Sequence, residues 1–172
     1  MPPPLTIRPA VPADAVAILR VHREAILARS AAHYPPATLD AWAVGPTPER
    51  IARQQHQIAD PAVITLVAEN AGQILGFAIA APAAGELRSL YVKPNPVGGV
   101  GSALLAELEA RAFAICPALA CDASLNAVPF YRSHGYVEQA ALEHTLSSGA
   151  RVACVRMVKN APAILPNDTI GS

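Results

Sequence analysis

Apolar and polar positions follow two kinds of spacing along the chain. In several short segments they alternate with period two, which is typical of β-strands that are buried on one face. In longer segments apolar residues recur every three or four positions, as in a helix that packs one face on a core. We predict strands over residues 5–8, 63–67, 74–81, 86–92, 119–125, 136–144 and 151–158, and helices over residues 100–115 and 129–134.

Three further helices are indicated mainly by their starting residues. The first begins at Pro12, because proline is favoured in a first turn, and Asp14 there matches the positive end of the helix dipole. Thr38 is expected to cap a short helix that ends at Ala43, and Thr47 to cap the next one. The apolar stripe of the first helix consists of Ala15, Leu19, His22 and Ile26, and that of the longest later helix of Val100, Leu104, Leu105, Leu108, Ala112 and Ile115.

The order of these elements predicts the fold class. The three strands between residues 63 and 92 follow one another through short turns, so they should form an antiparallel meander. Helix 100–115 then crosses to a strand that should lie parallel to the preceding one. The chain is expected to form one mixed α/β domain over residues 1–160, followed by a Pro-containing tail over residues 161–172.

Composition is that of a compact globular domain. The 172 residues are 52% hydrophobic and 15% charged, which is enough for a core without disulfides or metals. Lysine and arginine, 13 together, balance 13 acidic residues, so the positive surplus on which non-specific nucleic-acid binding depends is absent. No apolar run approaches the ~20 residues that span a bilayer, and the first residues, Met1-Pro-Pro-Pro4, do not resemble a signal peptide. We therefore expect a cytoplasmic protein without nucleic-acid or membrane partners.

The three cysteines, Cys116, Cys121 and Cys154, are not expected to bind a metal or form a disulfide framework. They lack the spacing of metal-ligand pairs, and an odd number fits poorly with paired bridges. We expect small buried hydrophobic residues. A catalytic thiol is the alternative, although no histidine is marked as its base.

The segment over residues 94–102, Pro-Asn-Pro-Val-Gly-Gly-Val-Gly-Ser, is the most informative in the chain. Its glycines permit positive φ and let a ligand approach the backbone. Because a helix follows at once, main-chain N–H groups at the positive end of the helix dipole could bind a diphosphate. The loop lacks the Gly-Lys-Ser/Thr of a Walker loop, and it follows a meander and not the first βαβ unit of a dinucleotide fold. A tight turn without a ligand is the alternative.

Several motifs together resemble the GNAT acetyltransferase superfamily. Leu90-Tyr-Val-Lys-Pro94 resembles the family's strand that ends in Val-x-Pro, and Gly99-Val-Gly101-Ser-Ala-Leu-Leu105 resembles the loop that opens its helix. Asn126-Ala-Val-Pro-Phe-Tyr131 with Gly135-Tyr136 resembles its Phe-Tyr-x-x-x-Gly-Phe motif. The resemblance runs from about residue 5 to residue 159. It implies a mostly antiparallel, twisted sheet with one parallel crossover and helices on both faces.

The resemblance implies acetyl-CoA as the acetyl donor, with no metal. The pantetheine arm would pair with main-chain groups of the third meander strand like an added strand, and the diphosphate would lie on the amides that open the following helix. Family members carry Gln or Arg where Pro96 stands, so the diphosphate would depend on amides alone. Asn126 would contact the arm, or is a turn-forming residue. The residues implied in cofactor binding are Leu90, Tyr91, Val92, Val97, Gly98, Gly99, Val100, Gly101, Ser102, Asn126 and Tyr131.

Two catalytic residues are also implied by the resemblance. Tyr131 matches a tyrosine that can protonate the departing sulfur, since a phenol is protonated at neutral pH; an aromatic residue that only packs on the helix is the alternative. Glu86 matches a position where some members carry a general base, which would take a proton from the attacking amine. Alternation places Glu86 on the face of Leu90 and Val92, and a solvated partner of Arg88 is the alternative.

Four residues are expected near the acceptor, namely His22, His33, Tyr34 and Trp42. The last three lie in the segment that covers the acceptor site in the family, and residues 34–42 resemble a bacterial subgroup of it. A place in the core is the alternative for His22, and simple packing is the alternative for Trp42.

The expected function is direct transfer of an acetyl group from acetyl-CoA to a primary amine of a small molecule or peptide. A non-catalytic acyl-CoA sensor or a scaffold domain is the alternative. The apolar tail residues Ile164, Leu165 and Ile170 could pack on a second subunit and so form a homodimer.

Overall fold

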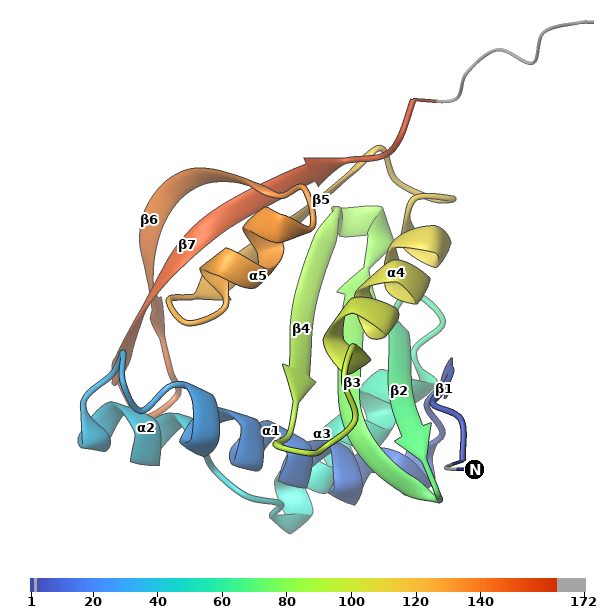
Figure 1. Ribbon diagram of the computed structural model, residues 1–172. Coiled ribbons are helices and arrows are strands. Elements are labelled where there is room, and N and C mark those ends of the chain that lie inside the picture. Colours follow the sequence, from blue (N-terminus) through green and yellow to red (C-terminus); the bar gives the residue numbers. More distant parts are fainter. Residues whose placement is uncertain (2, 164–172) are drawn as a thin grey trace, which may run out of the picture.

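The computed structural model describes residues 1 and 3–163, and it contains one seven-stranded sheet with helices on both faces (Figure 1). The strands are β1 (Thr6–Pro9), β2 (Ile64–Asn70), β3 (Gln73–Ala81), β4 (Glu86–Val92), β5 (Ala118–Ser124), β6 (Val137–Thr145) and β7 (Arg151–Asn160). The helices are α1 (Ala15–Arg29), α2 (Pro36–Trp42), α3 (Pro48–Ala59), α4 (Val100–Ala112) and α5 (Val128–Ser133). The tail residues Ile164, Leu165 and Ile170 lie outside the described residues.

The sheet has the order β1-β2-β3-β4-β5-β7-β6, and β4 and β5 form its parallel pair. All other neighbouring strands are antiparallel. This confirms the mixed, mostly antiparallel sheet with one crossover through α4. Two short 3-10 turns complete the described chain, Pro12–Asp14 before α1 and Pro82–Ala84 between β3 and β4.

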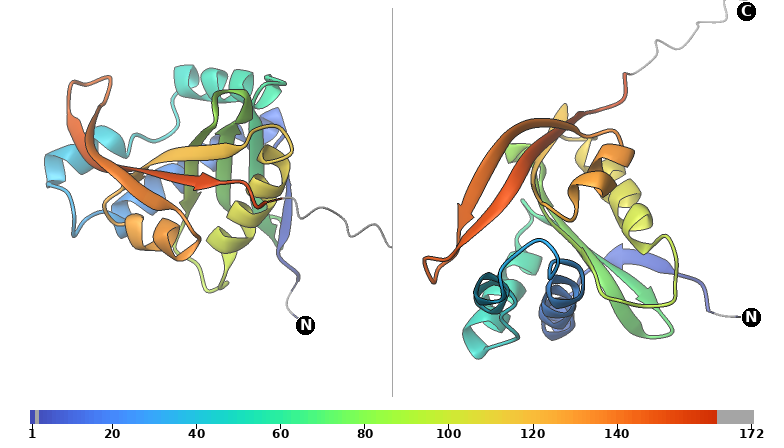
Figure 2. Two further views of the ribbon diagram at one scale, coloured as in Figure 1. Left: turned by 90° about the horizontal axis from the view of Figure 1, so that it is seen from above. Right: turned by 60° about the vertical axis from the view of Figure 1, so that its left-hand side comes forward.

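Helices α4 and α5 cover one face of the sheet, and α1 and α3 cover the other (Figure 2). On the α4 side the core is formed by Leu104 and Leu108 of the helix against strand residues such as Leu66 and Leu119, all of them fully buried. On the α1 side Ile18, Val21, Val67, Phe77 and Ile79 form a second core. Burial of these apolar stripes, at ~25 cal/mol per Å2 of apolar surface, fixes the helices on the sheet.

Strands β4 and β5 are paired only at their beginnings. The register contains a single pair, Glu86 with Ala120, and beyond it the two strands diverge (Figure 1). Strand β5 continues in a full ladder with β7, from Ala118 to Ser124. The main-chain groups on the β5 side of β4 are therefore left without a strand partner from residue 87 onward.

Most predicted elements are confirmed within a few residues. The hairpin between β2 and β3 turns at Ala71 and Gly72, where φ is 51° and 76°. Thr47 caps α3, because its hydroxyl accepts a hydrogen bond from the Arg50 main-chain N–H at 3.3 Å.

Two details of the helix predictions are wrong. Helix α2 begins at Pro36 and not at Thr38, because Pro36 has the fixed φ that suits a first helical position. Ile115 does not join the buried stripe of α4: the helix ends at Ala112, and the isoleucine side chain is 64% exposed.

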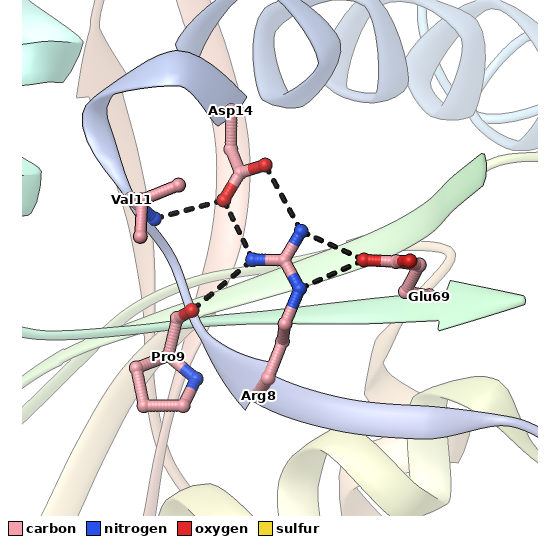
Figure 3. Close-up of polar contacts among 5 residues, drawn as sticks. All are labelled: Arg8, Pro9, Val11, Asp14 and Glu69. Atoms are coloured by element: carbon pink, nitrogen blue, oxygen red, sulfur yellow. Dashed lines mark hydrogen bonds and ion pairs between the residues drawn. The ribbon is translucent and has the colours of Figure 1, made fainter. Parts of the chain in front are cut away.

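A buried carboxylate ties the edge strand β1 to the start of α1 (Figure 3). Asp14 accepts hydrogen bonds from the Arg8 guanidinium at 2.8 and 3.1 Å and from the Val11 main-chain N–H at 2.8 Å. Arg8 also donates to Glu69 of β2 at 2.7 Å. The hydrogen bonds from Arg8 lower the pKa of Asp14.

Candidate active site

A cavity of about 390 Å3 lies between the end of β4, the start of α4, helix α5 and the end of α1. We call it the glycine-loop cavity. All eleven residues implied in cofactor binding line it: Leu90, Tyr91, Val92, Val97, Gly98, Gly99, Val100, Gly101, Ser102, Asn126 and Tyr131. The structure therefore brings together residues that are spread over forty positions of the sequence.

The start of α4 presents unpaired main-chain donors at this cavity. Gly99 precedes the helix with φ 74°, a conformation that favours glycine. The first helical hydrogen bond runs from the Ala103 N–H to the Gly99 carbonyl at 3.0 Å. The N–H groups of Val100, Gly101 and Ser102 come before that bond and so have no partner within the helix. Together with the helix dipole they favour an anion.

The Val97 amide is already engaged. It donates to the side-chain oxygen of Asn95 at 2.8 Å, and the Asn95 amide group in turn donates to the Lys93 carbonyl at 2.7 Å. This turn fixes the loop ahead of α4. The free donors are therefore the amides from Gly98 to Ser102, a shorter set than the sequence indicated.

Sequence analysis missed the contribution of α1 to this cavity. Ala25, Ile26 and Arg29 at its C-terminal end line the wall, together with Ser30, which follows the helix. Ser30 is buried and donates from its hydroxyl to the side-chain oxygen of Asn126 at 3.1 Å. The helical spacing from His22 through Ile26 to Ser30 extends the apolar stripe, and this was the available signal.

Tyr131 lies on α5 with its ring 5% exposed. It packs edge-on against Phe130 and Tyr136, with ring centroids 5.3 Å apart in each pair. Burial raises the pKa of Tyr131 well above the usual value of a phenol. The hydroxyl therefore keeps its proton at neutral pH and is a hydrogen-bond donor there.

A second cavity of about 540 Å3 occupies the space between β4, β5 and β7, and we call it the strand-gap cavity. Four of its lining side chains are charged: Glu86, Arg88, Asp122 and Arg156. Trp42, Val152 and Cys154 form apolar parts of its wall. Tyr91 and Ser124 line both cavities, so the two spaces meet at these residues.

Glu86 lines the strand-gap cavity and not the glycine-loop cavity. A bulge shifts the register of β3 and β4, so that Leu87 pairs with Ala80 and Ser89 pairs with Ile79. Leu87 consequently joins Leu90 and Val92 on the α4 side, which breaks the alternation expected along β4. Glu86 accepts a hydrogen bond from the Arg88 guanidinium at 3.0 Å.

The residues expected near the acceptor divide into two groups. Trp42 lines the strand-gap cavity, whereas His22, His33 and Tyr34 line neither cavity. The Tyr34 hydroxyl donates to the Ala153 carbonyl at 2.5 Å and accepts from the Leu125 N–H at 2.9 Å. Tyr34 thus joins the α1–α2 connection to the paired strands β5 and β7.

His22 supports the shared wall from behind. Its ring packs edge-on against Tyr91, with centroids 4.7 Å apart, and its buried Nδ1 has no hydrogen-bond partner among the described residues. Burial lowers the pKa of His22 to about 4, and the Arg50 charge contributes in the same direction. The imidazole is therefore neutral near pH 7. His33 is exposed.

Comparison with known proteins agrees with this geometry. Residues 31–159 match the family model of the acetyltransferase (GNAT) domain, which is about three quarters of the chain. The chain belongs to the GNAT acetyltransferase superfamily. The GNAT resemblance predicted from the motifs is thereby confirmed. No relative was found among curated proteins.

Solved structures show the same GNAT fold. A GCN5-related N-acetyltransferase from Rhodopseudomonas palustris is 29% identical, with a TM-score of 0.80 over 93% of this chain and 96% of that one. A PaiA N-acetyltransferase from Thermoplasma acidophilum, solved with coenzyme A, is 20% identical, with a TM-score of 0.70 over 91% and 99%. The yncA protein from Salmonella typhimurium, solved with acetyl-CoA, is 22% identical, with a TM-score of 0.67 over 96% and 99%.

The cysteines of this GNAT domain are buried and free, as expected of small hydrophobic residues. Burial, with the nearby Asp122 carboxylate, raises the pKa of Cys121 to about 12, so this thiol is not a nucleophile at neutral pH.

In residues 1 and 3–163 no group of three or more His, Cys, Asp or Glu side chains could hold a metal ion. Across the same residues, no helix has the length and apolar character needed to cross a bilayer.

Proposed function

We propose that this protein is an acetyl-CoA-dependent N-acetyltransferase that transfers an acetyl group directly to a primary amine. The observation that carries the proposal is the junction at Tyr91 and Ser124, where the two cavities meet. A direct transfer requires donor and acceptor to reach one point from separate sites. The glycine-loop cavity is the donor site, and the strand-gap cavity is the acceptor site.

The donor is held mainly by main-chain groups. Its diphosphate lies on the amides from Gly98 to Ser102 at the positive end of α4. Its pantetheine arm pairs with the free edge of β4 at Leu90, Tyr91 and Val92, because β5 has diverged there. The coenzyme A and acetyl-CoA bound to the PaiA and yncA proteins, which have the same fold, support this assignment.

The reaction forms a C–N bond and breaks the C–S bond of the thioester. The N–H near Val92 polarises the thioester carbonyl as negative charge develops on its oxygen. Tyr131 gives its proton to the departing sulfur, and solvent returns a proton to the phenolate while Glu86 releases the amine's proton to solvent. Glu86 takes a proton from the attacking amine through water, because one of its oxygens is free of Arg88 whereas both oxygens of Asp122 bind Arg156.

The test is thiol release from acetyl-CoA with a panel of primary amines, together with calorimetry of coenzyme A binding. We expect binding in the micromolar range and thiol release with at least one class of amine. Binding without release for any amine would instead indicate the sensor alternative. No binding of acetyl-CoA at millimolar concentration would overturn the proposal.

A further inference from the structure

Two arginines and two carboxylates line the strand-gap cavity, together with His144. Glu86 and Arg88 form one ion pair at 3.0 Å on β4. Asp122 of β5 and Arg156 of β7 form a second pair through two hydrogen bonds, at 2.7 and 3.0 Å. The four side chains are 33–51% exposed, so they remain hydrated and can exchange partners with a ligand.

Both arginines have spare hydrogen-bond donors. Only the Nε atom of Arg88 is engaged among the described residues, so both its terminal nitrogens are free. Arg156 uses Nε and one terminal nitrogen on Asp122, which leaves the other terminal nitrogen. A guanidinium with free terminal nitrogens binds a carboxylate in a planar, two-point geometry.

Both arginines lie close to the junction of the two cavities. Arg88 is three residues before Tyr91 on β4, a separation of roughly 10 Å that its long side chain can largely cover. Arg156 is two residues from Cys154, which pairs with the junction residue Ser124. An anionic group bound by these arginines would therefore lie only a few bonds from an amine placed at the junction.

We propose that the acceptor is a zwitterion, a primary amine with a carboxylate a few bonds away, as in a free amino acid. The inference rests on the proposed function and names the substrate class of that same site. The carboxylate binds between Arg88 and Arg156, and the amine lies beyond them at Tyr91 and Ser124, at the end of the cavity away from Glu86. Trp42 and Val152 contact the apolar part of the acceptor.

Other amine classes fit this cavity less well. A polyamine gains from a surplus of carboxylates, whereas here each carboxylate already has an arginine partner. The N-terminus of a peptide carries no carboxylate next to its amine, so the arginines would be left without a ligand. A zwitterion carries one positive and one negative group, so it complements the arginines and the carboxylates of the cavity at once.

The decisive experiment compares three acceptors that share one side chain: leucine, leucinamide and 3-methylbutylamine. Thiol release is measured with each acceptor at saturating acetyl-CoA and at one shared pH, chosen so that all three amines are partly neutral. We expect kcat/KM for leucine to exceed the other two values by roughly tenfold to a hundredfold, the effect of a charged hydrogen bond. Equal or better use of leucinamide or 3-methylbutylamine would overturn the zwitterion.

Two variants locate the effect. We expect Arg88→Gln to raise KM for leucine by roughly tenfold or more relative to any change in KM for 3-methylbutylamine, and to leave the Kd of coenzyme A unchanged. Arg88→Lys should restore part of the affinity, because it keeps the charge without the two-point geometry. Arg151→Gln, which alters an exposed arginine of β7 paired with Glu143 outside the cavity, is the matched control.

The outcomes separate this inference from the proposed function. If amines are acetylated but the carboxylate gives no preference, only the inference fails. If Arg88→Gln weakens all three acceptors equally, the arginine does not bind a carboxylate, and the inference again fails. If no amine is acetylated and coenzyme A does not bind, the proposed function fails and the inference with it.

Discussion

The two cavities differ in how the chain builds them. The glycine-loop cavity depends mainly on one stretch of backbone, from Asn95 to Ser102, and on small residues that leave its amides open. The strand-gap cavity is made of side chains from α2, β4, β5, β6 and β7, which are more than a hundred positions apart in the sequence. A site made of backbone depends on local conformation, whereas a site made of side chains depends on topology.

This difference has an energetic consequence. The main-chain donors at α4 remain whatever side chains surround them, provided that the loop keeps its conformation. The charged side chains of the strand-gap cavity are partly exposed, so substitutions there cost the fold little. Acceptor preference can therefore change while the donor site stays the same.

Tyr131→Phe should produce the largest effect, because it removes the proposed acid from the donor side of the junction. We expect kcat to fall by roughly a hundredfold, the usual contribution of a general acid, with the Kd of coenzyme A nearly unchanged. Tyr136→Phe is the matched control: Tyr136 is a neighbouring buried tyrosine that lines neither cavity. Single-turnover thiol release measures the step. Equal rates for the two variants would mean that Tyr131 only packs on the helix.

The stability of the fold should depend on pH through His22, which packs against the junction residue Tyr91. Its pKa falls from 6.5 to about 4 in the folded state, so only the unfolded state binds the proton between these values. Stability is therefore lost as pH falls from 6.5 toward 4, by up to about 3 kcal/mol at 1.36 kcal/mol per pH unit. Urea unfolding at pH 7 and pH 4.5 measures the loss.

His22→Phe keeps an aromatic ring against Tyr91 and removes the titration. We expect this variant to lose less stability between pH 7 and pH 4.5 than the parent, by about 2 kcal/mol. His33→Gln, at an exposed position, should lose as much as the parent. Asp14 also loses its stabilising charge at low pH, but it does so in every variant and cancels from the comparison. Parallel pH profiles for the parent and His22→Phe would contradict burial of a neutral imidazole.

Gly98→Asp tests whether the glycine-loop cavity binds an anion. Gly98 has open space around a new Cβ and no positive φ, so the side chain itself is tolerated. A carboxylate beside the proposed diphosphate should weaken coenzyme A binding by roughly tenfold. The fold should not lose stability, because a negative charge is favourable near the N-terminus of α4. Gly98→Ala adds the Cβ without the charge and should change the Kd less than about threefold. Calorimetry at low and high salt measures the Kd of coenzyme A for both variants. If Gly98→Asp and Gly98→Ala change this Kd equally, the diphosphate binds elsewhere.

The contrast between the cavities also explains what the sequence could predict. Local signals predicted the strands, the α4 crossover and the glycine loop as a candidate anion site, because each lies in one segment. The family resemblance supplied the other residues implied in cofactor binding, and all of them line the glycine-loop cavity. Alternation along β4 misplaced Glu86, since a bulge depends on the register with β3. The pairing of Asp122 with Arg156, and the place of both beside Arg88, result from strands β5 and β7 folding together. No local sequence pattern predicts that these three side chains lie together.

The smallest effect is expected at Pro96, where the glycine-loop cavity departs from its family. Pro96 is exposed and follows the Asn95 turn, so Pro96→Arg should restore a cation beside the diphosphate without disturbing the core. We expect coenzyme A to bind roughly threefold to tenfold more tightly at low salt, with the gain lost at high salt. Pro96→Ala is the control, because both variants lose the rigidity of proline and about 0.5–1 kcal/mol of stability. A gain in both variants would mean that the proline strains the loop, and a gain in neither would mean that the amides of α4 already satisfy the diphosphate.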